Sequence, residues 1–177
     1  GHLLVLLYAV LFLHPFYGSN DEFTLAAIAS GAYGEYTQYF IYLHSGFGWI
    51  LKGFYMLMPG VNWYSIVMYG LIFLSLSVIG GVWIQRARRV GGILAVLLVL
   101  ACAQPLYVEF QYTKTAAVVS AAGYVLLFCL GKEKERGRLQ TAGGILLLLL
   151  GSFIRFHAFG MVSLVAFGLW LLKAMEA

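Results

Sequence analysis

The chain has 177 residues, of which 62% are hydrophobic and only 10% are charged, and its formal net charge is +4. A soluble domain carries roughly 25% charged residues, so this composition excludes an ordinary soluble protein and indicates that lipid covers most of the surface. The mean hydropathy of +0.89 points the same way. The chain has no basic tail and no mixture of basic and aromatic residues of the kind that binds nucleic acid. We therefore expect a membrane protein without a nucleic-acid partner.

Apolar segments along the chain predict an all-α fold, a polytopic membrane helix bundle with about six spans. The first segment is short for a span, which needs about 20 residues, and Pro15 closes it because proline disfavours helix at the residue before it. We expect residues 1–177 to form a single transmembrane domain. Since the chain begins with Gly1 rather than Met and stops just after an apolar segment, we expect a fragment of a longer protein. The six predicted spans are 3–16, 61–84, 90–104, 116–130, 142–153 and 159–172.

Residues 17–60 are expected to lie on the membrane surface, because acids, a histidine and a lysine are scattered here among aromatic residues and glycines. Ser19 and Glu22 form the S-x-x-E pattern of a capping box, which predicts that the first of two surface helices begins directly after Ser19. Gly31 would end this helix. The second surface helix is predicted over residues 46–58. Both helices would belong to the first outer loop.

The basic residues predict the orientation of the spans. Six spans would place eight of the 11 Lys and Arg residues on one side of the membrane and three, among them Arg155, on the other. Cytoplasmic loops carry the excess of basic residues, so the amino end is expected in the cytoplasm. The segment with Asp21 and Glu22, the connector 106–115 with Glu109 and Lys114, and the turn with Arg155 and His157 would then all open on the outer face.

Few residues could carry chemistry, and the acidic pair Asp21-Glu22 is the first candidate. A carboxylate at the membrane surface could remove the proton of an acceptor hydroxyl or hold a divalent cation. Alternatively, acids in the first turn of a helix simply favour its dipole. Arg155 could bind a phosphate through paired hydrogen bonds or extend toward lipid headgroups. Glu35 and His44 could join Asp21 around a metal, but their spacing matches no ligand template, so no metal site is predicted.

Three further side chains are candidates for binding a substrate. His157 could assist Arg155, Lys52 on the second surface helix could meet an anionic lipid, and the aromatic residues from Tyr33 to Tyr42 could stack on sugar rings. The alternatives are a structural histidine, a solvated lysine and an aromatic belt at the membrane interface. The sequence contains no phosphate loop, zinc template or serine-nucleophile motif.

The order of these segments resembles the amino-terminal half of a GT-C type membrane glycosyltransferase, in particular bacterial multispan proteins of unassigned specificity. The resemblance covers most of the chain as architecture, although its motifs are short. It rests on a first span followed by Asn20-Asp21-Glu22, then Ala29–Gly34 with two surface helices, Leu51–Tyr55, Pro59–Tyr64 leading into the second span, and Ile154-Arg155-Phe156.

The resemblance implies a sugar donor on polyprenyl phosphate, used at the extracytoplasmic face of a bacterial inner (plasma) membrane. It implies that Asp21 is the catalytic base, Glu22 its supporting acid and Arg155 a contact for the donor phosphate, and it leaves a divalent cation open. Two alternatives remain: a transporter or flippase for a lipid-linked glycan, and a non-catalytic partner in envelope assembly. The absence of charge from the middle of the predicted spans argues against a transport path.

Overall fold

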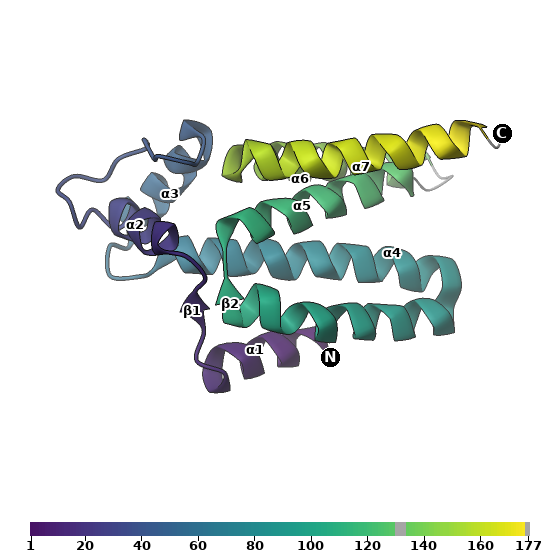
Figure 1. Cartoon of the computed structure of the whole chain (residues 1–177), viewed down its shortest axis with the longest axis horizontal. Coiled ribbons are helices and arrows are strands. Elements are labelled where there is room, and N and C mark those ends of the chain that lie inside the picture. Colours follow the sequence, from purple (N-terminus) through teal and green to yellow (C-terminus); the bar gives the residue numbers. More distant parts are fainter. Residues whose placement is uncertain (130–133, 176–177) are drawn as a thin grey trace.

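The computed structural model describes residues 1–129 and 134–175, with the backbone alone for 134–136. The predicted all-α class is confirmed, because these residues form seven α-helices, one π-helix and a single pair of two-residue strands (Figure 1). In chain order the elements are α1 (His2–Phe12), β1 (Phe16–Tyr17), α2 (Asn20–Ala29), α3 (Ser45–Leu57), α4 (Trp63–Cys102), the π-helix η1 (Ala103–Val108), β2 (Glu109–Phe110), α5 (Tyr112–Phe128), α6 (Lys134–Ile154) and α7 (Phe156–Met175).

Helix α4 consists of two antiparallel arms joined at a sharp bend (Figure 1). The backbone leaves helical geometry at Ala87 (φ −140°, ψ 40°) and Arg88 (φ 14°, ψ −87°). This bend lies in residues 85–89, a basic turn with three arginines that separates the predicted spans 61–84 and 90–104. A Cβ placed on Gly80 of the first arm would lie 3.1 Å from the Cβ of Ala95 in the second. Small residues therefore let the two arms approach closely, as in helix pairs within membranes.

Three described elements are long and apolar enough to cross a membrane, namely Trp63–Val108, Gly137–Ile154 and Phe156–Met175. This is fewer than the six spans predicted, for two reasons. The predicted spans 61–84 and 90–104 are the two antiparallel arms of α4, which are joined at the bend and form a single element. Helices α1 and α5 are also apolar, but with 11 and 17 residues they are shorter than a typical span of about 20 residues.

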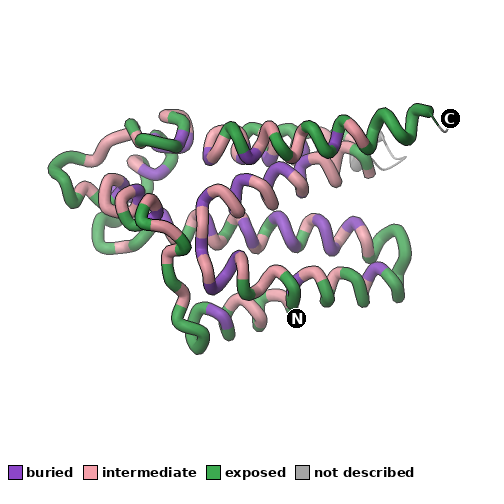
Figure 2. The backbone as a smooth tube through the Cα atoms, viewed as in Figure 1, coloured by how far each residue is buried: buried purple, intermediate pink, exposed green. Residues whose placement is uncertain are grey.

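Much of the apolar surface of the bundle faces outward (Figure 2). Helix α7 is exposed along most of its length, with exposed fractions of 67% for Met161 and 69% for Leu164. In water such a surface would be unfavourable, at roughly 25 cal/mol for each Å² of apolar area. A helical protein that places these side chains in lipid explains the arrangement.

Helices α2 and α3, predicted as surface helices, lie at one end of the bundle, away from the bend of α4 and the carboxyl end of the chain (Figure 1). Helix α2 begins at Asn20 as predicted, and Gly31 follows its end with a positive φ of 74° that favours glycine. Helix α3 matches the predicted 46–58 to within one residue. The largest fully buried side chains gather where α2, α3, α4 and β2 meet; they include Phe47, Leu51, Tyr55, Tyr64 and Phe110.

A short parallel bridge between β1 and β2 connects the segment before α2 to the segment before α5. Phe16 pairs with Glu109 and Tyr17 with Phe110. The backbone N–H of Gly18 extends the bridge by donating to the Phe110 carbonyl at 2.7 Å. Because this bridge comes directly before α2 and directly before α5, it holds the starts of the two helices near each other.

Candidate functional site

Glu22 is completely buried and connects three helices at the end of the bundle. Its Oε2 accepts a hydrogen bond from the Tyr64 hydroxyl at 2.5 Å, and its Oε1 accepts one from the backbone N–H of Tyr112 at 2.5 Å. No other charged side chain is buried in the described part of the chain. Burial raises the pKa of the Glu22 carboxyl, and the nearby Asp21 carboxylate adds to this, while the two hydrogen bonds oppose it.

The capping-box interpretation of Ser19 and Glu22 is wrong, although the helix begins where that pattern predicted. Ser19 is the N-cap residue with extended backbone (φ −150°, ψ 159°), but its side chain makes no cap hydrogen bond. Its buried Oγ has no hydrogen-bond partner among the described residues. The cause is a pair of tertiary hydrogen bonds. The Tyr64 hydroxyl and the Tyr112 backbone N–H both donate to the Glu22 carboxylate, which therefore does not turn back to the start of its own helix.

Arg155 lies between α6 and α7 and is held by two tyrosines. Its Nη1 donates to the Tyr112 hydroxyl at 2.8 Å. Its guanidinium carbon lies 5.0 Å from the ring centre of Tyr42 and 5.1 Å from that of Tyr112, and the two rings are nearly parallel, at 17°. Such cation–π contacts stabilise the cation by about 0.5–2 kcal/mol each. Arg155 is half-buried, so the residue is not fully enclosed by the protein.

Tyr112, the first residue of α5, joins the two halves of the predicted site. Its backbone N–H binds Glu22 and its hydroxyl binds Arg155. The Asp21 carboxylate and the Arg155 guanidinium both lie close enough to the Tyr112 hydroxyl to act on it electrostatically. The acidic pair and the arginine, which are far apart in the sequence, are therefore brought to the same end of the bundle.

The other three predicted substrate-binding residues lie apart from this cluster. His157 is exposed on the first turn of α7, and Tyr33 is 72% exposed in the loop after α2. Lys52 lies over the ring of Trp49 on its own helix, 5.5 Å from the ring centre. Within the described residues, none of the three makes a hydrogen bond, ion pair or ring contact with Glu22, Tyr112 or Arg155.

His44, weighed above as a metal ligand, caps a helix. Its Nδ1 accepts from the Gly46 N–H at 3.1 Å at the start of α3, and its ring stacks on Phe153 with the centroids 4.6 Å apart. Its backbone N–H donates to the Phe153 carbonyl at 2.8 Å. These contacts fix the loop that carries Tyr42 against the end of α6. No group of three or more His, Cys, Asp and Glu side chains in the described ranges is placed to hold a metal ion.

Sequence reasoning missed the tyrosines that assemble the cluster. Tyr64 was noted only as the end of the segment Pro59–Tyr64 that leads into a span, Tyr42 was grouped with the other loop aromatics, and Tyr112 was not singled out. Each is amphipathic, with a ring that packs and a hydroxyl that needs a partner when buried. That property marks buried tyrosines at a bundle end as candidates, but it does not identify their partners.

Comparisons with known proteins give no further constraint. No family model matches this chain, and no curated protein or solved structure matches it either. The functional argument therefore rests on the residues and their geometry.

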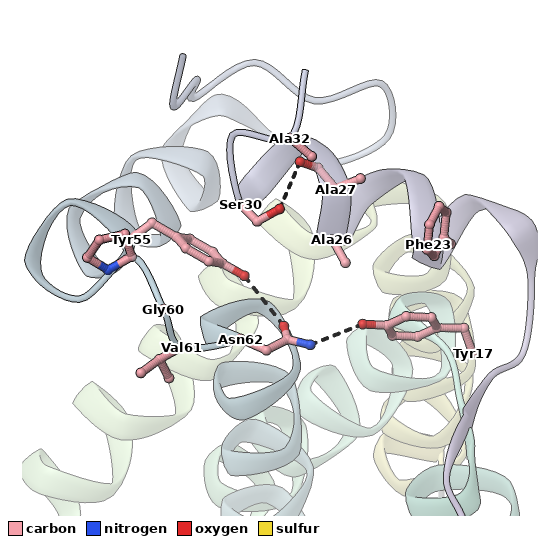
Figure 3. Close-up of a pocket in the computed structure, with 11 residues that line it drawn as sticks. Tyr17, Phe23, Ala26, Ala27, Ser30, Ala32, Tyr55, Gly60, Val61 and Asn62 are labelled. Atoms are coloured by element: carbon pink, nitrogen blue, oxygen red, sulfur yellow. Dashed lines mark hydrogen bonds between the residues drawn. The ribbon is translucent and has the colours of Figure 1, made fainter. Parts of the chain in front are cut away.

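A pocket of about 400 Å³ opens beside α2 (Figure 3). The amide of Asn62 lies at its edge, where Oδ1 accepts from the Tyr55 hydroxyl at 3.4 Å and Nδ2 donates to the Tyr17 hydroxyl at 3.3 Å. The backbone N–H of Tyr64 donates to the Tyr55 hydroxyl at 3.2 Å. The Tyr64 hydroxyl binds Glu22, so Tyr64 contacts the pocket edge through its backbone and the buried carboxylate through its side chain.

Proposed function

We propose that this chain is part of a GT-C type membrane glycosyltransferase that takes its sugar from a polyprenyl-phosphate donor at the extracytoplasmic face of a bacterial inner membrane. The observation that supports the proposal best is the attachment of both Glu22 and Arg155 to Tyr112. Sugar transfer from a lipid phosphate needs a base for the acceptor hydroxyl and a cation beside the departing phosphate. The cluster brings a carboxylate pair and a fixed guanidinium to the same end of the bundle.

Asp21 takes the role of the base in this proposal. It is half-buried, whereas Glu22 is completely buried, so Asp21 is the acid of the pair that a substrate can reach. Asp21 removes the proton of the acceptor hydroxyl as the acceptor oxygen attacks the anomeric carbon. The bond from that carbon to the phosphate breaks with inversion, and polyprenyl phosphate departs. Glu22 acts as a positioning residue, because its two hydrogen bonds fix the first turn of α2.

Arg155 binds the donor phosphate in this proposal. A guanidinium carries five N–H donors, and the structure records one hydrogen bond from this group, to Tyr112. Tyr42 and Tyr112 hold the guanidinium plane in place. A preorganised guanidinium loses less side-chain entropy for each hydrogen bond that it forms to an anion. The remaining donors can then bind two phosphate oxygens at once.

The proposed topology has six passes, made by α1, the two arms of α4, α5, α6 and α7. The bend of α4, with its basic turn, lies in the cytoplasm in agreement with the positive-inside rule. Helices α2 and α3 then lie outside, beside the proposed catalytic residues. The polyprenyl tail of the donor lies along the apolar outer faces of the helices, which are exposed in the described chain.

The direct test is a transfer assay with the full-length protein in proteoliposomes and a panel of polyprenyl-phosphate sugars. We expect one donor to be consumed and Arg155→Gln to lower kcat/KM about tenfold or more, equivalent to about 1.4 kcal/mol or more. Arg89→Gln, at the opposite end of the bundle, is the matched control and should leave transfer unchanged. Movement of labelled glycolipid across the bilayer without transfer would instead support the transporter alternative. If the protein showed neither transfer nor movement of the glycolipid, the result would support the non-catalytic partner.

A further inference from the structure

The pocket beside α2 has two walls, which come from different elements and carry no charged side chain (Figure 3). One wall is a single face of α2, because three of its residues and the C-cap residue Ser30 recur at the i, i+3, i+4 and i+7 spacing. The other wall comes from β1, the last turn of α3 and the turn before α4. None of the lining side chains is charged; they are Tyr17, Phe23, Ala26, Ala27, Ser30, Ala32, Tyr55, Pro59, Gly60, Val61 and Asn62.

Two polar groups at the pocket keep unused hydrogen-bonding capacity. Asn62 has two N–H donors on its amide, and one of them binds the Tyr17 hydroxyl. Its Oδ1 is occupied by Tyr55 and by the backbone N–H of Ser65. Ser30 donates its hydroxyl proton to the Ala27 carbonyl at 3.1 Å, which leaves its oxygen free to accept. Within the described residues, the pocket lining therefore offers one N–H donor and one hydroxyl acceptor among alanines.

We propose that this pocket binds an uncharged carbohydrate. A sugar hydroxyl both donates and accepts hydrogen bonds, so it matches an amide donor and a serine acceptor in one site. The C–H face of a sugar ring is apolar and can pack on the alanines and on the ring of Phe23, which is 65% exposed. The volume lies in the range of small-molecule sites, about 300–1,000 Å³.

Other ligand classes match this lining less well. An anion would find no lysine, arginine or histidine among the lining residues, and a cation would find no carboxylate. A hydrocarbon chain would cover the amide of Asn62 and the hydroxyl of Ser30 without replacing their contacts with water. Each uncompensated polar group would then cost about 1–3 kcal/mol. An uncharged, polyhydroxylated ligand avoids both penalties.

This carbohydrate site is separate from the proposed reaction centre. At 3.6 residues per turn, Asp21 lies about 200° around the axis of α2 from Phe23, so the two side chains leave opposite faces of the helix. A sugar in the pocket would therefore not place its hydroxyls on the proposed base. The inference does not depend on the proposed transfer reaction, because it assigns a binding site and not a chemical step.

Photo-crosslinking tests the site directly. The full-length protein in nanodiscs is irradiated with uncharged methyl glycosides that carry a diazirine, without any lipid donor. We expect saturable labelling of peptides that contain residues 17–32 and 55–62, and competition by the parent glycoside. Absence of saturable labelling, labelling confined to other peptides, or displacement by an alkane but not by the glycoside would overturn the proposal.

Substitutions then separate this pocket from unspecific binding. Ala27→Leu enlarges a side chain in the α2 wall and should weaken glycoside binding at least tenfold, whereas Thr24→Leu, a similar enlargement on the same helix but outside the lining, should change it less than about twofold. Asn62→Asp keeps an acceptor for the Ser65 N–H and removes the free donor, so it should also weaken binding. Unchanged binding by Asn62→Asp would contradict the proposal even if Ala27→Leu failed to fold.

Discussion

The Tyr64 hydroxyl donates a hydrogen bond of 2.5 Å to the Glu22 carboxylate, and both side chains are completely buried. This contact ties the first turn of α2, a surface helix, to the first turn of α4, the longest element of the bundle. Hydrogen bonds to an ionised group are short and roughly twice as strong as neutral ones. The orientation of α2, and with it the position of Asp21, therefore depends on a buried polar contact.

Two replacements of Glu22 should distinguish the contribution of its hydrogen bonds to stability from the contribution of its charge. Glu22→Gln keeps an oxygen for the Tyr112 N–H and an amide that can donate to the Tyr64 oxygen, so it should be mildly destabilising. Glu22→Ala leaves two buried donors without acceptors and should lower the free energy of unfolding by about 1–3 kcal/mol for each. Denaturant unfolding in detergent measures both. Equal stability of the Ala and Gln variants would contradict the structural role of the carboxylate.

The raised pKa of Glu22 should make stability depend on pH in a defined direction. Between the ordinary glutamate value of about 4.3 and the raised value, the folded protein keeps a proton that the unfolded chain has lost. The free energy of unfolding should therefore fall as the pH rises through this window. Thermal unfolding of the wild type against Glu22→Gln isolates this contribution, because the glutamine does not titrate. If the stability of the wild type rose relative to the variant over the same pH window, the result would contradict a raised pKa of Glu22.

Two glycines of α3 offer a matched test of packing. A Cβ on Gly48 would collide with the backbone carbonyl of Gln38, whereas a Cβ on Gly53 would meet no atom within 4 Å. Gly53→Ala should be neutral or stabilising by up to about 1 kcal/mol, since alanine favours helix. Gly48→Ala should destabilise by about 1–3 kcal/mol, because the loop that carries Gln38 must move. The difference between the two melting temperatures is the measurement, and a Gly48→Ala variant as stable as Gly53→Ala would show that this loop does not pack on α3.

Much of the fold could be predicted from the sequence because it depends on local patterns. The apolar segments gave the helical class, the glycine at position 31 marked the end of α2, and the basic turn at 85–89 marked the bend of α4. Three described elements are long and apolar enough to span a membrane where six spans were predicted, because the segments 61–84 and 90–104 belong to one bent element, α4. Hydropathy also does not show that helices α1 and α5 have only 11 and 17 residues.

Of the residues in the candidate site, only the charged ones could be predicted from the sequence. Asp21, Glu22 and Arg155 are conspicuous because so few charges occur among apolar residues. The role of Glu22 was harder to predict, because a capping box depends on local spacing whereas Tyr64 and Tyr112 reach Glu22 from 42 and 90 residues away. Such tertiary contacts leave no periodic signal. Lys52, His157 and Tyr33 have the right chemistry for substrate binding, yet sequence spacing could not tell which outer residues share a cluster.

Arg155→Lys should show whether the geometry of the guanidinium matters beyond its charge. Lysine keeps the positive charge but cannot bind a phosphate through two parallel hydrogen bonds. If Arg155 binds the donor phosphate, the variant should raise the KM for the polyprenyl-phosphate donor about tenfold, with a smaller effect on the KM for the acceptor. A loss confined to protein stability, with both KM values unchanged, would restrict Arg155 to a structural role beside Tyr42 and Tyr112.

The role of Asp21 is the central claim, and one measurement tests it most directly: the rate of sugar transfer by full-length Asp21→Asn in proteoliposomes, compared with the wild type at equal amounts of inserted protein. Asparagine keeps the size of the side chain but cannot accept the proton of the acceptor hydroxyl, and general-base catalysis contributes about 10²–10⁴-fold to a rate. We predict a loss of at least a hundredfold, with membrane insertion and thermal unfolding unchanged. Transfer by this variant at the wild-type rate would contradict the proposed base.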